Sequence, residues 1–454
     1  MIKKICVISD YFLKKLVFSP VAVFPFRKAT VQRIKTLLRK KILIYFWVEY
    51  FSSKLITLDE KSKRKKCIRI LILNHFRYGT DLNVLRAHPD VHLIAIPIQY
   101  QAFINNFYFN NEMDQSVRNP EESDLGKKLI NYLCCFIPAF SKRNRIDCVV
   151  SCSYFYKQDL CWQVACRMSH VPFIVLQKEY TVHECNIDYL TTLVRNRQSF
   201  LGNKILVHNQ NVKELFVEAD VCNAKDIVVT GPLRMDTIYK WAVEKIGSQA
   251  KKQIVLFSFL PMAGGVVHKH SAEGTFDRYS RYNGFVKLFE QVHGAMAEIA
   301  VENPGVDVVI KCKWLGKWEE MVNDAILMES RLCVNDIPNL IVTGESPYKY
   351  IEESMVVISF CSTSTIESRM YRRPVIIPVF AEASGKYNNY VYYKKYFKDY
   401  IIATSKEDLK ARSLQYTENE IKAPLLPDEI VKEQVTYFDG KIVDRVVDEI
   451  RKAL

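Results

Sequence analysis

Short apolar runs rich in β-branched residues alternate with helical stretches along most of this chain. In its first half we expect strands at Ile68–Leu73, Val91–Ile96, Asp147–Ser151, Val171–Leu176, Lys204–His208 and Asp226–Thr230. These runs are apolar at nearly every position, which is typical of parallel strands covered by helices on both faces. The first half therefore predicts a doubly wound α/β domain.

The same pattern begins again after a charged stretch around residues 243–252. The second set of expected strands comprises Ile254–Phe259, Val306–Lys311, Leu340–Val342, Met355–Ser359, Val375–Pro378 and a short strand from residue 401. A chain of 454 residues is too long for one ordinary core, which favours two domains. Two doubly wound units place a ligand cleft at the carboxyl ends of their strands.

We expect three parts from this pattern. Residues 1–66 form an N-terminal segment, residues 67–242 a first Rossmann-like domain and residues 243–454 a second one, whose last helix, near 440–453, crosses back to the first. The two domains should face each other across the cleft.

Positive charge is concentrated in the N-terminal segment. Residues 1–66 contain 17 Lys and Arg against four acids, a net charge of +13 out of +14 for the whole chain. The remaining body is nearly neutral, so it lacks the basic face that a nucleic-acid-binding domain requires. We therefore expect no nucleic-acid partner.

The N-terminal segment combines this charge with aromatic residues. No apolar run is long enough for a transmembrane helix, and Asp10, Lys14 and Lys15 interrupt the only stretch resembling a signal peptide. The basic residues lead into an aromatic run that includes Trp47 and Phe51, a composition typical of a helix lying on an anionic membrane surface. The alternative is a domain-capping helix with a solvated charged face.

The cysteines indicate the compartment. The chain has 13 Cys, an odd number, without the spacing of metal ligands. They are interpreted as buried, reduced thiols of a cytoplasmic protein. If the N-terminal segment binds lipid, the protein is peripheral on the inner face of the cytoplasmic membrane.

A hydroxyl-rich turn within residues 356–380 carries the clearest chemical signal. Ser362, Thr363 and Ser364 lie between a strand and a helix, where exposed backbone amides and the helix dipole bind phosphate. Glu367, one turn into the helix, is placed to accept hydrogen bonds from ribose hydroxyls. Ser364 and Glu367 also have the spacing of a capping box, and the two roles are compatible.

This turn resembles the donor-nucleotide end of the C-terminal domain of GT-B glycosyltransferases. It is similar in UDP-N-acetylglucosamine 2-epimerases and in CDP-glycerol glycerophosphotransferases. Residues 209–236 and 303–314 resemble two further segments of bacterial capsule, lipopolysaccharide and other surface-carbohydrate enzymes. The chain departs from those patterns with Pro232-Leu233 ahead of Arg234, with Ala219-Asp220 at a usual Gly, and with Cys312 at a usual Pro.

The resemblance covers about residues 145–405 and implies a GT-B fold and an enzyme. The implied activity is transfer of a sugar from a nucleotide-sugar donor to a glycan or lipid-linked acceptor in bacterial surface polysaccharide biosynthesis. The alternatives are a CDP-glycerol or polyol phosphotransferase, for which His268 or His270 would supply a catalytic histidine, and a nucleotide-sugar 2-epimerase. A scaffold that retains a degenerate transferase fold is the non-enzymatic alternative.

The leaving nucleotide of such a reaction needs positive charge and hydrogen-bond donors. Candidates for this donor site, besides the hydroxyl-rich turn and Glu367, are Gly231, Arg234, Ser258, Lys311 and Lys313. GT-B enzymes usually work without a bound metal, and no D-x-D motif follows a strand here. We therefore expect neither a metal nor another cofactor.

An inverting transferase also needs a base for the acceptor hydroxyl. Glu179 follows an expected strand at the carboxyl edge of the sheet, and Lys178 beside it is placed to pair with it or to bind an acidic sugar. His75 is a further candidate base, and His183 and Glu184 are reserves. Each of these residues is also compatible with a structural role.

Overall fold

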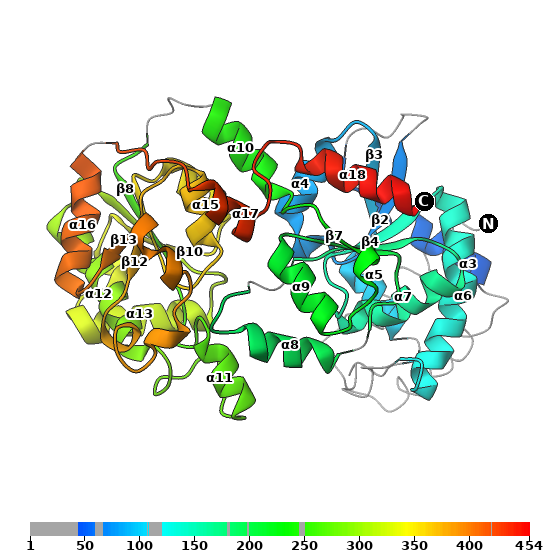
Figure 1. Cartoon of the computed structure of the whole chain (residues 1–454), viewed down its shortest axis with the longest axis horizontal. Helices are drawn as coiled ribbons and strands as arrows, with labels where there is room; N and C mark the ends of the chain where they lie inside the picture. Colours follow the sequence, from blue (N-terminus) through cyan, green and yellow to red (C-terminus); the bar gives the residue numbers. More distant parts are fainter. Residues whose placement is uncertain are drawn as a thin grey trace.

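The computed structural model describes residues 44–59, 67–106, 108, 120–178, 182–197, 199–244, 250–418 and 420–454. It consists of two α/β domains side by side, each built around one largely parallel sheet (Figure 1). This is the expected GT-B arrangement of two Rossmann-like domains, and that prediction is confirmed.

The sheet of the first domain has seven strands in the order β1-β3-β2-β4-β5-β6-β7. Their bounds are β1 Ile56–Thr57, β2 Ile68–Ile72, β3 Val91–Ala95, β4 Cys148–Ser151, β5 Phe173–Leu176, β6 Lys204–Val207 and β7 Ile227–Val229. All neighbours pair in parallel except β1, which is antiparallel to β3. The helices are α3 Ile44–Ser52, α4 Gly79–Ala87, α5 Ile98–Asn105, α6 Asp124–Asn144, α7 Lys157–Met168, α8 Ile187–Arg195 and α9 Gln210–Glu218.

The second sheet has six parallel strands in the order β10-β9-β8-β11-β12-β13. Their bounds are β8 Gln253–Phe257, β9 Asp307–Lys311, β10 Leu340–Thr343, β11 Val356–Ser359, β12 Val375–Pro378 and β13 Ile401–Ala403. The helices include α11 Val266–Ala272, α12 Val286–Glu302, α13 Lys317–Ser330, α14 Pro347–Glu353, α15 Ser364–Met370 and α16 Lys406–Glu418. The central strands β8 and β11 are buried at every position, which explains their uninterrupted apolar sequences.

Helix α3 corrects one interpretation of the N-terminal segment. Trp47, Tyr50 and Phe51 are almost completely buried, and Phe51 contacts Phe136 of α6 edge to face at 5.8 Å between ring centroids. This aromatic run belongs to the core of the first domain, so the domain-capping alternative holds for residues 44–52. Residues 1–43 and 60–66 lie outside the described residues, and a membrane role for them stays a prediction.

No helix in the described ranges is both long and apolar enough to cross a membrane.

The chain passes between the domains twice. Helix α10 (Arg234–Glu244) leads from the first domain toward the second, and α17 (Asp428–Gln434) and α18 (Ile442–Ala453) return (Figure 1). Helix α18 lies on the first domain, where Glu449 forms a salt bridge of 2.8 Å with Lys204. Asp236 of α10 accepts hydrogen bonds from the backbone N–H groups of Ile442 and Val443, at 3.0 and 2.7 Å.

Candidate functional site

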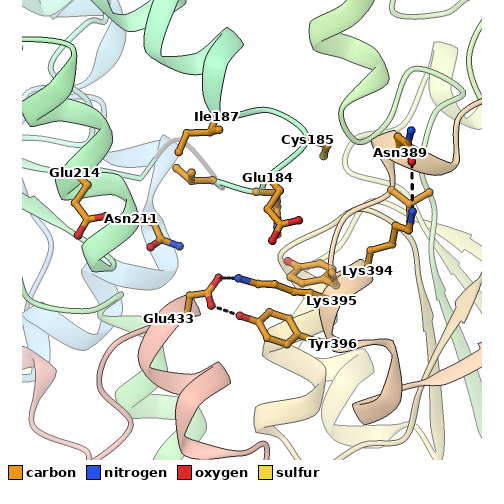
Figure 2. Close-up of a pocket in the computed structure, with 14 residues that line it drawn as sticks. Glu184, Cys185, Ile187, Asn211, Glu214, Asn389, Lys394, Lys395, Tyr396 and Glu433 are labelled. Atoms are coloured by element: carbon orange, nitrogen blue, oxygen red, sulfur yellow. Dashed lines mark hydrogen bonds and ion pairs between the residues drawn. The ribbon is translucent and has the colours of Figure 1, made fainter.

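A cavity of about 800 Å³ lies between the two domains. Its first-domain wall comes from the segment before α8 and from α9, and its second-domain wall comes from the connection after β12 (Figure 2). The lining residues are Val182, His183, Glu184, Cys185, Ile187, Asn211, Glu214, Asn389, Val391, Tyr393, Lys394, Lys395, Tyr396 and Glu433. These segments follow β5, β6 and β12, so the cavity lies at the carboxyl ends of strands from both sheets, as expected for a ligand site.

The two domains contribute opposite charges to this cavity. Glu184 and Glu214 come from the first domain, whereas Lys394 and Lys395 come from the second (Figure 2). Glu433 of α17 pairs with Lys395 at 2.6 Å and accepts a hydrogen bond from the Tyr396 hydroxyl. Burial opposes ionisation of Glu433, but the hydrogen bonds from Lys395 and Tyr396 outweigh it and lower its pKa.

His183 lines the cavity and contacts two tyrosines of the second domain. Its ring stacks on Tyr392 at 4.1 Å between centroids and meets Tyr393 edge to face at 4.7 Å. Burial lowers the pKa of His183 to about 3, so the imidazole is neutral at physiological pH. Within the described residues its buried Nε2 has no hydrogen-bond partner.

A second, smaller cavity of about 40 Å³ shares Tyr393 with the first and brings several predicted donor residues together. Thr363, Glu367 and Arg234 all line it. Arg234 Nε donates to Glu367 Oε1 at 2.7 Å, and its guanidinium also lies 3.4 Å from the Asp81 carboxylate. Burial opposes the guanidinium charge, but the two carboxylates outweigh it and raise the pKa of Arg234.

Two residues of this cluster were not predicted. Asp81, in the first turn of α4, also accepts a hydrogen bond of 3.0 Å from the backbone N–H of Arg234. His208 follows β6 and lines the same small cavity. Burial, together with the positive charge of Arg234, lowers the pKa of His208 to about 3. The signal in the sequence was the position of His208 at the carboxyl end of the expected strand Lys204–His208.

The hydroxyl-rich turn is internally hydrogen bonded. Ser359 Oγ lies 2.9 Å from both Ser364 Oγ and Thr365 Oγ1, and Ser364 Oγ donates to Ser362 Oγ at 2.9 Å. Thr363, which precedes α15, makes no side-chain cap. The capping-box prediction is therefore wrong, because Glu367 binds Arg234 instead of the start of its own helix.

Neither cavity is lined by Ser258, Lys311 or Lys313. The Ser258 hydroxyl is 2.9 Å from His293 Nε2 and accepts a hydrogen bond of 2.9 Å from Trp318 Nε1. Lys311 is buried, its Nζ donates to the carbonyl of Cys312, and burial lowers its pKa. Lys313 is exposed beside Trp314. Gly231 lines a third small cavity beside Asp81 and His208.

The base candidates are also dispersed. His75 belongs to a short 3-10 helix after β2; burial lowers its pKa, and its Nδ1 has no hydrogen-bond partner among the described residues. The Lys178 ammonium donates to the carbonyl of Arg77. Glu179 lies outside the described residues. The reserves His183 and Glu184 are the two that line the large cavity.

The remaining loop histidines have other environments. His268 packs against Tyr189 at 4.7 Å between ring centroids, across the domain boundary. His270 is buried, with Nδ1 2.8 Å from Thr275 Oγ1. Within the described ranges, no three His, Cys, Asp or Glu residues are grouped in a way that would hold a metal ion. The absence of a cofactor stays a prediction.

Known proteins resemble this chain in structure but not in sequence. No protein-family model and no curated protein sequence matches the chain. UDP-GlcNAc 2-epimerase from Neisseria meningitidis, solved with UDP-GlcNAc, is 11% identical over 85% of this chain and 100% of its own, with a TM-score of 0.45. The wall teichoic acid polymerase TagF is 12% identical over 95% and 98%, with a TM-score of 0.45.

HepE from Anabaena, solved with UDP-glucose, is 10% identical over 85% of this chain and 100% of its own, with a TM-score of 0.43. These are similarities of backbone architecture.

Proposed function

We propose that this protein is a glycosyltransferase that moves a sugar from a nucleotide-sugar donor to a glycan or lipid-linked acceptor in bacterial surface polysaccharide biosynthesis. The observation that carries the proposal is the large interdomain cavity, with carboxylates on one wall and lysines on the other, beside the Glu367–Arg234 pair. Its volume of about 800 Å³ lies within the range of small-molecule sites.

The donor is assigned to the second-domain side. Glu367 would accept hydrogen bonds from the ribose, and the backbone amides of the turn at Ser362–Ser364 would face the phosphates. Lys394 and Lys395 would balance the negative charge that develops on the leaving nucleotide as the sugar–phosphate bond breaks.

The acceptor is assigned to the first-domain side. Glu184 would take the proton from the attacking hydroxyl, which forms the new bond to the anomeric carbon. Glu184 is exposed in the cavity and carries no hydrogen bond or salt bridge to another described residue, so its carboxylate is available to a ligand. After the transfer, the proton passes from Glu184 to solvent.

Nucleotide binding tests the donor assignment. We expect one of UDP, GDP, CMP, CDP or ADP, or a sugar conjugate, to raise the unfolding temperature, since a ligand at one hundred times its Kd adds about 2.7 kcal/mol of stability. The shift should be lost in Glu367→Gln. Asp81→Asn is the matched control, because it also removes a carboxylate partner of Arg234 but lies on the first domain.

Equal loss in both variants would mean that the effect passes through Arg234 rather than through ligand contact. No shift with any nucleotide in the well-folded protein would contradict the proposal and favour the scaffold interpretation. A response to CDP compounds alone would redirect it to polyol phosphate transfer.

Turnover tests the acceptor assignment. Glu184→Gln should keep the nucleotide-induced shift and lower kcat by about 10²-fold or more, as expected for loss of a general base. Glu214→Gln, on the same wall, is the control and should keep most of kcat. Full activity of Glu184→Gln would remove Glu184 from the mechanism.

A further inference from the structure

A cluster of aromatic and basic side chains is exposed on the second domain, away from the residues that line the interdomain cavity. Its members come from the connection between α11 and α12, from the connection between β9 and α13, and from the first residue of α13. Cation–ring contacts and one hydrogen bond join six of them into one surface, which we call the Trp314 surface: Phe276, Arg278, Tyr279, Lys313, Trp314 and Lys317. Leu315 follows Trp314 in the same connection.

Large apolar side chains on this surface are unusually exposed. The exposed fractions are 39% for Phe276, 39% for Trp314 and 46% for Leu315. Phe276 and Trp314 share the guanidinium of Arg278, and grouped exposed apolar residues mark interaction sites more often than single ones do.

Cations lie over the aromatic rings. The Lys317 ammonium is 4.5 Å from the centre of the Tyr279 ring, and the Trp314 ring has the Lys313 ammonium at 5.2 Å and the Arg278 guanidinium at 5.7 Å. Trp314 Nε1 also donates to the Tyr279 hydroxyl at 3.3 Å. These contacts hold the two loops together with their charged groups toward solvent.

We infer that the Trp314 surface binds the anionic surface of a lipid bilayer. Tryptophan and tyrosine prefer the headgroup region of a membrane, and lysine and arginine beside them attract anionic lipids. Phe276 and Leu315 supply apolar groups that enter the boundary with the acyl chains. Cations and aromatic rings therefore stand together on this surface, a combination that suits an anionic membrane.

The inference is independent of the proposed transfer reaction. It assigns a surface of the second domain, whereas the basic residues of the N-terminal segment precede the first domain. Membrane contact there would place the carboxyl edge of the second sheet close to the bilayer, because both loops leave that edge.

The tryptophans supply a local reporter for the test. All five tryptophans of the chain are described, and Trp314 is the exposed one; Trp47, Trp162, Trp241 and Trp318 are between 0% and 9% exposed. Vesicles of phosphatidylcholine and phosphatidylglycerol with brominated acyl chains quench a tryptophan that enters the bilayer. We expect them to quench the full-length protein, less so at high salt, and to leave Trp314→Phe unquenched.

Charge variants test the electrostatic part. Lys313→Ala with Lys317→Ala should weaken partitioning to the anionic vesicles by about 10-fold or more. Lys127→Ala with Lys128→Ala, which removes the same charge from exposed positions of α6, is the matched control and should leave the quenching of Trp314 unchanged.

Three results would overturn the inference. The first is an absence of vesicle binding. The second is vesicle binding without quenching of Trp314, which would assign the membrane contact to the N-terminal segment. The third is a change of Trp314 emission with an acidic polysaccharide but not with vesicles. None of these results depends on nucleotide binding, so they leave the glycosyltransferase proposal to its own test.

Discussion

Arg234 and Arg373 are both largely shielded from solvent, and their partners differ in kind. Arg234 bridges carboxylates of both domains, Asp81 and Glu367. Arg373 donates mainly to backbone carbonyls, those of Ile351 and Glu352, and pairs with Glu420 at 2.9 Å. A ligand can compete for the carboxylate of Glu367, whereas the carbonyls around Arg373 belong to the fold itself.

We therefore expect Arg373 to contribute to the free energy of unfolding rather than to ligand binding. Its side chain is 1% exposed and also lies 4.9 Å from the ring centre of Trp241. Arg373→Ala leaves several buried acceptors unsatisfied, and we expect a loss of about 3–5 kcal/mol of unfolding free energy in urea denaturation. Arg373→Lys should recover only part of this loss, because an ammonium cannot reproduce the planar fork. A neutral effect of Arg373→Ala would contradict this assignment.

His183 predicts a pH dependence of stability. Its pKa is about 3 in the fold and 6.5 in the reference state, so the unfolded chain binds more protons between these values. Stability is fully present above pH 6.5 and falls as the pH falls toward 3, by at most about 1.4 kcal/mol per pH unit for one group. His183→Gln should flatten this slope in thermal unfolding from pH 8 to pH 4.

The exposed His170 provides the control. His170→Gln should retain the slope of the wild type. If His183→Gln lowers stability equally at every pH, the contribution of His183 is the stacking contact with Tyr392 rather than its neutral state.

At the scale of elements, the strands were predictable and the role of α3 was not. The strands carry continuous apolar runs, such as the one that became β11, because helices cover both sheet faces. An aromatic helix beside basic residues has the same composition whether its aromatic face meets lipid or protein. Only the position of α6 decides that Phe51 packs against Phe136.

The candidate site was predictable where residues belong to a recognisable turn. Glu367 and Arg234 were predicted separately and meet in the structure. Glu433 was missed, because α17 reaches the cavity from a remote part of the chain. Asp81 was missed because an acid in a first helical turn is ordinarily a cap.

Helix α3 gives a direct test of its packing. Trp47 is 1% exposed, whereas Tyr45 on the same helix is 78% exposed. Trp47→Ala should cost about 3–5 kcal/mol in denaturant unfolding, as for other buried aromatic residues. Tyr45→Ala is the matched control and should cost less than about 0.5 kcal/mol. Similar small effects of both variants would mean that α3 is not part of the cooperative core.

At the scale of the molecule, the return of the chain in α18 joins the two domains. Asp236 accepts hydrogen bonds from the first two backbone N–H groups of this helix. Asp236→Ala should lower stability by about 1 kcal/mol through loss of this cap, measured by chemical denaturation. Asp444→Ala, on an exposed side chain of the same helix, should have little effect. Equal costs of the two changes would argue against the capping role.

The two covalent crossings lie along one edge of the molecule, with α10 and α17, and α8 and α11 touch along the opposite edge (Figure 1). The contact on that opposite edge is non-covalent, and we call it the α8–α11 contact. It includes Tyr189 and His268, whose rings lie 4.7 Å apart between centroids. His268 packs on Tyr189 in this contact, and His183 stacks on Tyr392 across the domain boundary. Burial lowers the pKa of His183 to about 3 and that of His268 to about 4. If the two domains separate along this edge, both histidines become exposed and take up protons in mildly acidic solution. A ligand that brings the domains together must then release those protons. The heat of ligand binding near pH 5 should then vary with the ionisation enthalpy of the buffer. Calorimetry in different buffers therefore measures how far the two domains separate before the ligand binds.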